Sequence, residues 1–294
     1  MEVVISTLGI HANHKLPHAA FASLWDAIHV PADLKDKLLS QAILNFTARP
    51  FVDRARVPLH GIILMTGVPG TGKTSLAKGL ADRIAQVLTK QKLHYLEVEP
   101  HSLQSAQHGE SQKAVKELFA TTIAERAAMG PTFVLLDEVE TLVVDRSRLS
   151  MDANPIDVHR ATDAALVQLD HLSATYTNLI FVATSNFPAA IDSAFRSRCD
   201  LVLEVPLPNE QAIRSIMVDT IDAFAVHFPK AASIAKGADF EAAVHAAVGL
   251  DGRQVRKAVA SAFTFEREVA VDPNKVTAAH LLKATKNAKR KETK

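Results

Sequence analysis

The chain has 294 residues, of which 48% are hydrophobic, and its 33 basic residues nearly balance its 32 acidic residues. A hydrophobic fraction of this size excludes a disordered or fibrous protein and predicts one large or two smaller domains with packed cores. The near-zero net charge produces no overall field that would select nucleic acid or an anionic membrane as a partner.

The first residues and the cysteine content predict a cytoplasmic protein. Residues 1–10 lack the basic and long apolar stretches of a secretory signal, and Cys199 is the single cysteine, which excludes an internal disulfide. The apolar runs are far shorter than the roughly 18 residues that suggest a membrane span, so we expect no membrane association. The histidines of HANH (11–14) have a spacing that a metal could use, but no thiolate or carboxylate cluster accompanies them, and we expect exposed polar side chains.

Five short apolar runs predict the strands of a parallel sheet in a doubly wound α/β fold. They are apolar at successive positions, which indicates burial on both faces. Most are separated by 25 or more residues, which is enough for crossover helices. The runs are IILMT (62–66), LHYLEV (93–98), TFVLLD (132–137), LIFVAT (179–184) and LVLEV (201–205).

Helical periodicity replaces the strand pattern in the last third of the chain. We predict a short amino-terminal segment (1–20), a large α/β domain (21–206) and a small all-helical domain (207–294). Within the large domain, residues 21–46 predict one or two helices, broken at Pro31. The last twelve residues carry six basic residues and one acidic residue; they could touch nucleic acid, but we expect a solvated, frayed tail.

A glycine-rich loop, GVPGTGKTS (67–75), lies between the first predicted strand and a helical pattern and matches the phosphate-binding motif G-x-x-x-x-G-K-[ST]. In this context backbone N–H groups bind phosphate at a helix amino terminus, where the helix dipole favours negative charge. We therefore predict that the chain binds ATP, with Lys73 at the β and γ phosphates and the Thr74 hydroxyl on Mg²⁺. The residues assigned to the nucleotide are Gly67, Pro69, Gly70, Thr71, Gly72, Lys73, Thr74 and Ser75.

Polar residues at two further strand ends complete the predicted site. Asp137 and Glu138 emerge at the carboxyl end of a parallel strand, where open α/β sheets bind ligands. We predict that Asp137 holds Mg²⁺ through water and that Glu138 orients and polarises the attacking water; the alternative is that both acids cap the next helix. Asn186 follows the strand at 179–184 and can hydrogen-bond the same water or the γ phosphate, or it is only a turn residue.

Three arginines are candidates for the charge that develops during hydrolysis. Arg196 and Arg198 precede the last predicted strand, from which a guanidinium could reach the nucleotide of a neighbouring subunit and raise the rate by about 10³ to 10⁵. The alternative is that both are solvated surface residues. Arg253 begins a helix of the carboxyl-terminal domain, from which a cation could contact the γ phosphate and make the position of that domain depend on the nucleotide.

These motifs, in this order, resemble the AAA+ ATPases, which implies a Mg²⁺-dependent ATP hydrolase that forms hexameric rings with nucleotide between subunits. The segments LLDEVETLVVDR, NPIDVHRATDAALVQLD, TSNFPAAIDSAFRSRCD and LDGRQVRKAV resemble the HORMA-remodelling branch, of the pachytene-checkpoint and thyroid-receptor-interactor type. FASLWDAI also resembles that branch, so the likeness runs from about residue 17 to the helical domain. It implies that ATP is used to convert a closed HORMA-domain protein to its open form.

The resemblance places a substrate-gripping pore loop in HSLQSAQHGESQKAV (101–115). In the family an aromatic residue projects from this loop, whereas the matching positions here are Gln107 and His108, followed by Gly109. Hydrogen bonds to the substrate backbone would have to replace the aromatic contact. The alternative is an ordinary helix-entry loop with Ser111 as its cap.

The short amino terminus adds to the resemblance. Only about 20 residues precede LWD, so no adaptor-docking domain is expected and a HORMA partner would bind directly. Compact members of this kind resemble bacterial ones, which accompany HORMA proteins and cyclic-nucleotide synthases in anti-phage defence. In related ATPases the segment around Trp25 lies near the nucleotide, so Trp25 could line an adenine pocket, although core packing is more usual for a lone tryptophan.

Cys199, next to Arg198, could have a lowered pKa and a reactive thiol, but we favour an inert residue because nothing nearby suggests redox chemistry. Two other functions share the motifs. A helicase or clamp loader requires a basic groove, for which the sequence offers only the terminal tail and two lysines near the pore loop, so nucleic acid is an unexpected partner. A nucleotide-gated scaffold would bind ATP without turnover, and Glu138 argues against it.

Overall fold

The protein is described from a computed structural model, which covers residues 9–89, 92–103, 110–145 and 155–292. Two compact units make up the chain, and each combines segments that are distant in sequence. The first unit comprises Met1–Trp25, Ala32–Gly67 and Lys73–Glu204. The second comprises Asp26–Pro31, Val68–Gly72 and Val205–Lys294. The central residues of the glycine-rich loop therefore belong to the second unit, whereas Gly67 and Lys73 on either side of them belong to the first.

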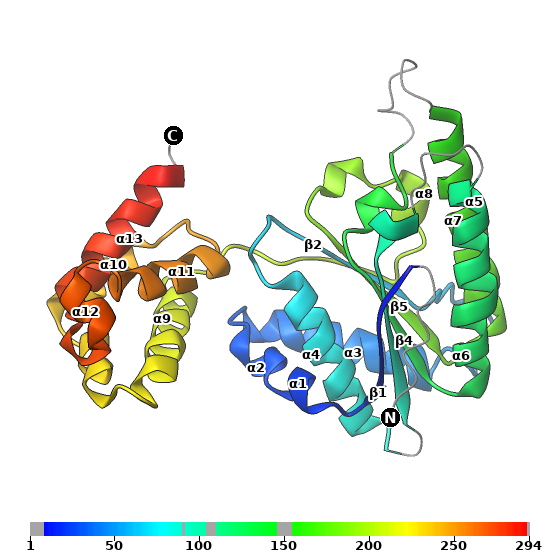
Figure 1. Ribbon diagram of the computed structural model, residues 1–294. Helices are drawn as coiled ribbons and strands as arrows, with labels where there is room; N and C mark the ends of the chain where they lie inside the picture. Colours follow the sequence, from blue (N-terminus) through cyan, green and yellow to red (C-terminus); the bar gives the residue numbers. More distant parts are fainter. Residues whose placement is uncertain (1–8, 90–91, 104–109, 146–154, 293–294) are drawn as a thin grey trace. The chain divides into compact units, whose positions relative to one another are not determined.

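A six-stranded sheet with the order β1-β3-β4-β5-β2-β6 forms the centre of the first unit (Figure 1). Along the part of the sheet with the order β3-β4-β5-β2-β6, all neighbouring strands pair in parallel, which confirms the doubly wound α/β prediction. The carboxyl ends of these strands therefore meet at one edge of the sheet. The strands are β1 (Ile10–Leu16), β2 (Ile62–Thr66), β3 (Leu93–Val98), β4 (Thr132–Leu136), β5 (Leu179–Ser185) and β6 (Leu201–Glu204).

The prediction of five strands was wrong, because β1 adds an antiparallel edge strand next to β3. Its residues alternate between exposed and more buried positions, the pattern of a strand with one solvated face. His14 is one of the inward residues, and its ring centroid lies 4.6 Å from that of His18 and 5.6 Å from that of Phe21. Of the two histidines in this segment, His11 is exposed as expected, whereas His14 is half-buried. No group of three metal-ligating side chains was found in the described part of the chain.

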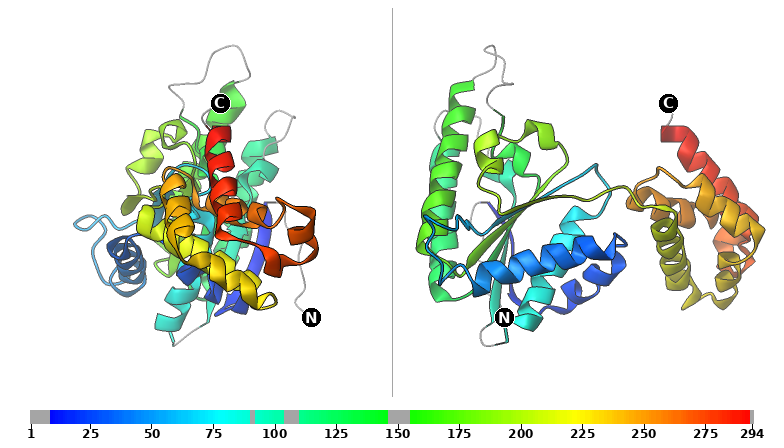
Figure 2. Two further views of the ribbon diagram at one scale, coloured as in Figure 1. Left: turned by 90° about the vertical axis from the view of Figure 1, so that its left-hand side faces the viewer. Right: turned by 180° about the vertical axis from the view of Figure 1, so that it is seen from behind.

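Helices cover both faces of the sheet (Figures 1 and 2): α3 and α4 lie on one face, and α5, α6 and α7 lie on the other. α3 begins directly after Pro31, as predicted, and two short helices precede it. The helices of this unit, with α2 reaching two residues into the other unit, are α1 (Ala19–Ala22), α2 (Leu24–Ala27), α3 (Ala32–Thr47), α4 (Lys73–Val87), α5 (Glu110–Glu117), α6 (Ala124–Met129), α7 (Pro155–Thr175) and α8 (Ser193–Arg196). Short turns of other helix types are η1 (Pro100–Leu103), η2 (Leu118–Ile123), η3 (Val139–Thr141) and η5 (Pro188–Ala190).

Alternate strand residues and the α5–α7 layer form a core on one face of the sheet. Leu64, Val134 and Phe181 are fully buried there, with Phe119 and Leu169 from the helices packed into the same cluster. Because both faces are covered in this way, β2, β4 and β5 are apolar at successive positions, and their polar residues lie at or near the strand ends: Thr66, Thr132, Thr184 and Ser185.

The last ninety residues of the second unit consist of helices and turns, with no strand among those that the structure describes. Asp251 forms a capping box with Gln254 at the start of α11, and the Asn209 side chain accepts a hydrogen bond from Ala212 N at the start of α9. No helix in the described ranges has the length and hydrophobicity needed to cross a membrane. The elements are α9 (Glu210–Ala225), η6 (Pro229–Ala235), α10 (Ala238–Ala246), α11 (Gly252–Ala262), α12 (Arg267–Val271), η7 (Pro273–Lys275) and α13 (Ala278–Glu292).

Candidate functional site

The glycine-rich loop joins the end of β2 to the start of α4, as the motif predicts. Gly67, Gly70 and Gly72 have backbone φ angles of 147°, 83° and 91°, which residues other than glycine rarely adopt. Lys73 is the first residue of α4 and is buried, and its Nζ atom donates a hydrogen bond to the Gly67 carbonyl oxygen at 2.9 Å. The ammonium group is therefore held at the amino terminus of α4, where the helix dipole favours an anion.

Asp137 lies directly after β4 and accepts hydrogen bonds from two hydroxyl groups. Thr74 Oγ1, one residue into α4, donates to Asp137 Oδ1 at 2.8 Å. Thr184 Oγ1 of β5 donates to the same oxygen. Thr184 is 1% exposed, and its hydroxyl oxygen also accepts a hydrogen bond from the Glu138 backbone N–H at 3.2 Å. The predicted magnesium residues Thr74 and Asp137 are thus in contact, and Thr184 connects them to Glu138.

A hydroxyl group beside a carboxylate is a set of hard oxygen donors that fits Mg²⁺, which takes one or two protein oxygens and completes its shell with water and phosphate. Thr74 and Asp137 could hold the ion in this way. The sequence analysis did not predict Thr184. The available signal was a hydroxyl residue within the otherwise apolar run LIFVAT, next to a predicted functional strand end.

Glu138 lies at the same edge of the sheet and has hydrogen-bond partners on both carboxylate oxygens. Asn186 Nδ2, just past β5, donates to Glu138 Oε1 at 3.1 Å. His101 Nε2, in η1, lies 3.2 Å from Glu138 Oε2. The Asn186 backbone N–H donates to Glu140 Oε1 at 3.0 Å. The structure therefore brings Glu138 and Asn186 together, and His101 and Glu140 are contacts that the sequence analysis did not predict.

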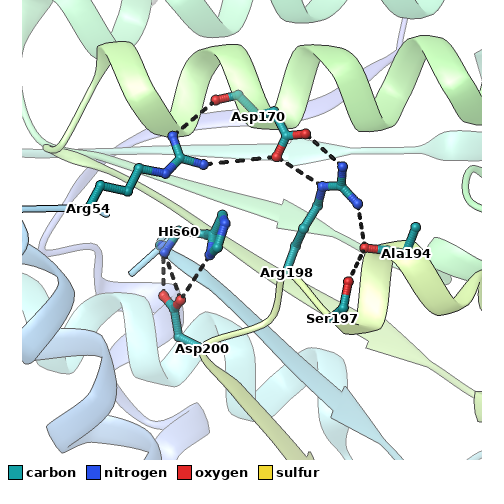
Figure 3. A network of polar contacts seen from close by, with 8 residues as sticks. Arg54, His60, Asp170, Ala194, Ser197, Arg198 and Asp200 are labelled. Atoms are coloured by element: carbon teal, nitrogen blue, oxygen red, sulfur yellow. Dashed lines mark hydrogen bonds and ion pairs between the residues drawn. The ribbon is translucent and has the colours of Figure 1, made fainter. Parts of the chain in front are cut away.

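Arg198 is held by Asp170 of α7 in the same chain (Figure 3). Its Nε donates to Asp170 Oδ1 at 2.9 Å and one terminal nitrogen donates to Oδ2 at 2.7 Å, while the other donates to the Ala194 carbonyl oxygen at 2.6 Å. These hydrogen bonds lower the pKa of Asp170, against the effect of its burial, and raise the pKa of Arg198. Arg196, two residues earlier, is exposed, and we find no hydrogen bond or ion pair of its side chain with any described residue.

The residues around Arg198 anchor the connection between α8 and β6 (Figure 3). Arg54 donates to the Asp170 carbonyl oxygen at 3.5 Å, and its guanidinium lies 3.9 Å from the Asp170 carboxylate. Asp200 accepts hydrogen bonds from the backbone N–H groups of His60 and Gly61, both at 2.7 Å, just before β2 begins. The chain segment that carries both arginines is therefore fixed to α7 at one point and to the start of β2 at another.

The surroundings of Cys199 and Trp25 indicate that both residues contribute to packing rather than to chemistry. Burial raises the pKa of the Cys199 thiol to about 12, more than nearby Arg196 lowers it, which confirms the inert interpretation. Trp25 is 8% exposed, in agreement with core packing. Gly79 of α4 makes this packing possible, because a Cβ atom at that position would lie 2.5 Å from the Trp25 backbone nitrogen.

In the second unit, the glycine-rich loop contacts α11. The Arg253 backbone N–H donates to the Gly70 carbonyl oxygen at 3.3 Å, and the Arg253 side chain is exposed. Arg256 donates to the Ala27 carbonyl oxygen at 2.6 Å. Hydrogen bonds therefore attach the short segments 26–31 and 68–72 to the helices of Val205–Lys294 within one compact unit.

The remaining predicted nucleotide residues are distributed along the loop. Thr71 is buried, and its Oγ1 donates to the Val68 carbonyl oxygen at 3.0 Å. Pro69 is exposed, and Ser75 is half-buried in the first turn of α4. The predicted pore-loop residues Gln107, His108 and Gly109 lie outside the described residues. α5 begins at Glu110, so Ser111 lies within its first turn rather than at the expected cap position.

One family model and several known proteins match this chain in sequence. Residues 63–207 match the ATPase family associated with various cellular activities (AAA). CD-NTase-associated protein 6 from Pseudomonas aeruginosa is 54% identical over 281 residues, 96% of this chain and 92% of the relative. The pachytene checkpoint protein 2 homolog of Xenopus tropicalis is 34% identical over 221 residues, 72% of this chain; the match spans half of that longer relative.

Two solved structures share the fold. The structure of C. elegans PCH-2 superimposes with a TM-score of 0.76 at 27% identity, over 96% of this chain and 75% of that one. A chain of the E. coli MS115-1 HORMA:CdnC:Trip13 complex superimposes with a TM-score of 0.71 at 16% identity, over 94% of both chains. The second likeness is one of fold alone.

Proposed function

The chain belongs to the AAA family of ATPases, within the branch of pachytene checkpoint protein 2 and CD-NTase-associated protein 6, and from this premise we propose that it is an ATP-driven remodeller of a HORMA-domain protein. In this proposal six copies form a ring, each binds Mg²⁺ and ATP, and hydrolysis drives the conversion of a closed HORMA protein to its open form. The contact cluster of Thr74, Asp137, Glu138 and Asn186 at one edge of the sheet is the observation that carries the hydrolysis step.

Lys73 and the residues of this cluster have distinct proposed roles. Lys73 would bind the β and γ phosphates, and Thr74 and Asp137 would hold Mg²⁺, which when bound neutralises charge on the phosphates. Glu138 would accept a hydrogen bond from the attacking water and draw off its proton, while Asn186 would hold both the carboxylate and the γ phosphate. The 2.8 Å and 3.1 Å contacts already connect these side chains in pairs.

The proposed arginine in trans is supplied by the segment between α8 and β6. Arg196 is exposed and would reach a neighbouring subunit without breaking a side-chain hydrogen bond or ion pair with any described residue, whereas Arg198 would first have to leave the Asp170 carboxylate. A guanidinium at the neighbour's γ phosphate is worth about 10³ to 10⁵ in rate, so hydrolysis would depend on ring assembly. Arg253, next to the loop at Gly70, would report the presence of the γ phosphate to the helical segment.

The names of similar proteins support the choice of substrate and context. One names a CD-NTase-associated protein, and another names a complex of HORMA, CdnC and Trip13. We extend these partners to this chain: a HORMA-domain protein as the substrate, gripped by the pore loop at Gln107–Gly109, and a cyclic-nucleotide synthase whose anti-phage signalling the remodelling would regulate. The proposed location is the cytoplasm, where ATP and such a synthase are available.

Glu138→Gln provides the test. The variant keeps the shape and hydrogen-bonding capacity of Glu138 but removes its basicity, so ATP turnover should fall by about 10² to 10⁴ while ATP binding persists. With ATP present, it should elute as a hexamer and retain a purified HORMA-domain protein encoded near its gene. Phosphate release and size-exclusion light scattering measure these outcomes.

Four results would contradict parts of this proposal. A wild-type rate in Glu138→Gln would remove Glu138 as the base. A monomer that hydrolyses ATP rapidly would exclude the ring, and binding of ATP by the wild type without phosphate release would favour a nucleotide-gated scaffold. Salt-sensitive binding of DNA or RNA that stimulates turnover would favour the nucleic-acid machine.

A further inference from the structure

Glu138 follows the middle one of three neighbouring strands, β3, β4 and β5. The segments that follow the two outer strands each carry a side chain that contacts Glu138. The sheet order places β4 between β3 and β5, and the strands pair in register so that Leu136 lies opposite both Val98 and Ala183. Glu138 follows β4 and therefore lies between the segments that follow the other two strands. His101 reaches it from the β3 side and Asn186 from the β5 side.

The backbone of Glu138 has an unusual conformation that several contacts maintain. Its φ and ψ are 53° and 51°, and Glu138 is the one residue other than glycine with positive φ in the described part of the chain. Its N–H donates to Thr184 Oγ1 at 3.2 Å, and its carbonyl oxygen accepts hydrogen bonds from Thr141 N and Thr141 Oγ1 at 3.1 and 2.9 Å. Strained residues that are held from all sides in this way occur where function requires a fixed side-chain direction.

We propose that His101 is a positioning residue for Glu138: it holds Oε2 while Asn186 holds Oε1, and the two contacts fix the plane of the carboxylate. The inference rests on the proposed role of Glu138 as the base. An ionised carboxylate can only accept hydrogen bonds, so the contact requires a proton on His101 Nε2. Each carboxylate oxygen has a further lone pair, which leaves Glu138 able to accept a hydrogen bond from water.

The effect of His101 should appear in turnover rather than in folding. The His101 and Glu138 side chains are 55% and 47% exposed, and exposed pairs of this kind add little to the free energy of unfolding. A base displaced by about 1 Å, in contrast, can lose about 10²-fold in rate. Because Asn186 still holds one oxygen, we expect His101→Ala to lower kcat by about 10-fold, with the KM for ATP unchanged.

Two conservative substitutions make the test specific to one ring nitrogen. A glutamine amide nitrogen can occupy the place of His101 Nε2, whereas an asparagine amide nitrogen falls near the place of Nδ1. His101→Gln should therefore recover most of the lost kcat, and His101→Asn should remain as slow as His101→Ala. Ser102→Ala is the matched control, because the neighbouring Ser102 hydroxyl donates to the Glu99 carbonyl oxygen and not to Glu138.

The experiment measures steady-state ATP hydrolysis of the full-length variants, together with their melting temperatures, in wild-type and Glu138→Gln backgrounds. We expect the kcat loss in the wild-type background, no further loss in Glu138→Gln, and unchanged melting temperatures. Two results would overturn the positioning role while the proposed function stands. The first is an inactive Glu138→Gln together with a wild-type rate of ATP hydrolysis in His101→Ala. The second is an equal kcat for His101→Gln and His101→Asn. If Glu138→Gln itself remains active, the proposed role of Glu138 as the base fails instead.

Discussion

The edge of the sheet at Glu138 and the segment from the end of α8 to β6 both carry side chains that we propose for ATP hydrolysis, but the two regions hold them differently. Glu138 is about half-exposed and has single contacts from His101 and Asn186, each longer than 3 Å. Arg198 is 26% exposed and has a bidentate ion pair with Asp170. The first arrangement orients a base by two single hydrogen bonds that leave it open to water, whereas the second holds a cation against another residue of the same chain.

This difference separates residues that are available to contact the reacting groups from residues that hold a neighbouring segment in place. The half-exposed Glu138 carboxylate, and the exposed Arg196, whose side chain has no hydrogen bond or ion pair with a described residue, are both available to contact another molecule. The strongly held Arg198 fixes the segment from which Arg196 projects, and it can contribute directly only by exchanging Asp170 for a triphosphate. The following substitutions test this comparison.

The arginines should give the largest effect. Arg196→Ala should lower turnover by about 10³-fold or more, with ATP binding and melting temperature unchanged, because it removes a charge needed only in the transition state. Arg198→Ala should also lose turnover, and in addition it should lose stability, because Asp170 is left without its bidentate partner. Phosphate release and thermal unfolding separate the two. A wild-type rate in either variant would contradict the role of that residue.

Thr184 should give an intermediate effect. Thr184→Val keeps the shape of the side chain but removes the hydroxyl that contacts Asp137 and the Glu138 N–H, so we expect roughly 10-fold lower kcat and about 1 to 3 kcal/mol lower stability. Thr162→Val is the matched control, because Thr162 is equally buried and its hydroxyl donates to the Leu142 carbonyl oxygen. The control should lose stability only. Equal turnover in both variants would mean that Thr184 has no role beyond folding.

Asp170 should give the smallest effect, and that effect should depend on pH. Asp170→Asn should lower the free energy of unfolding by about 1 kcal/mol at pH 7, a value reduced for the 39% exposure of the carboxylate. Because the folded-state pKa of Asp170 is lowered, its contribution is complete above the unfolded pKa of about 4 and is lost as the pH falls through the folded value.

Urea titrations at pH 7 and pH 3 measure the Asp170 effect. The difference between wild type and Asp170→Asn should shrink at pH 3. Asp222→Asn, at an exposed carboxylate of α9 without a side-chain partner in the described ranges, should show no difference at either pH. A gap that stays constant with pH would show that the ion pair does not account for it.

The sequence predicted the residues that follow buried strands, because an apolar run that ends in polar residues gives both the strand and its functional end. Asp137, Glu138 and Asn186 were found in this way, and the structure brings them together. β1 was missed because an edge strand alternates, and His14 at an inward position conceals the alternation. Such a strand lacks the continuous apolar pattern on which the other five predictions rested.

Contacts between distant segments could not be predicted from the pattern. Asp170 and Arg198 are 28 positions apart, and their pairing depends on how α7 packs against the sheet. His101 follows β3 by three residues, but nothing in the sequence states that β3 and β4 are neighbours, which is what brings His101 to Glu138. The partners of site residues therefore had to come from the strand order and the packing of helices.

The most direct test of the central claim mixes Glu138→Gln with Arg196→Ala. Each variant alone should be inactive, but in mixed rings about a quarter of the sites combine an intact Glu138 with a neighbour's intact Arg196. The account predicts that ATP hydrolysis reappears on mixing, in proportion to that fraction. If the mixture stays as inactive as its two components although mixed hexamers form, the arginine does not act between subunits and the account is contradicted.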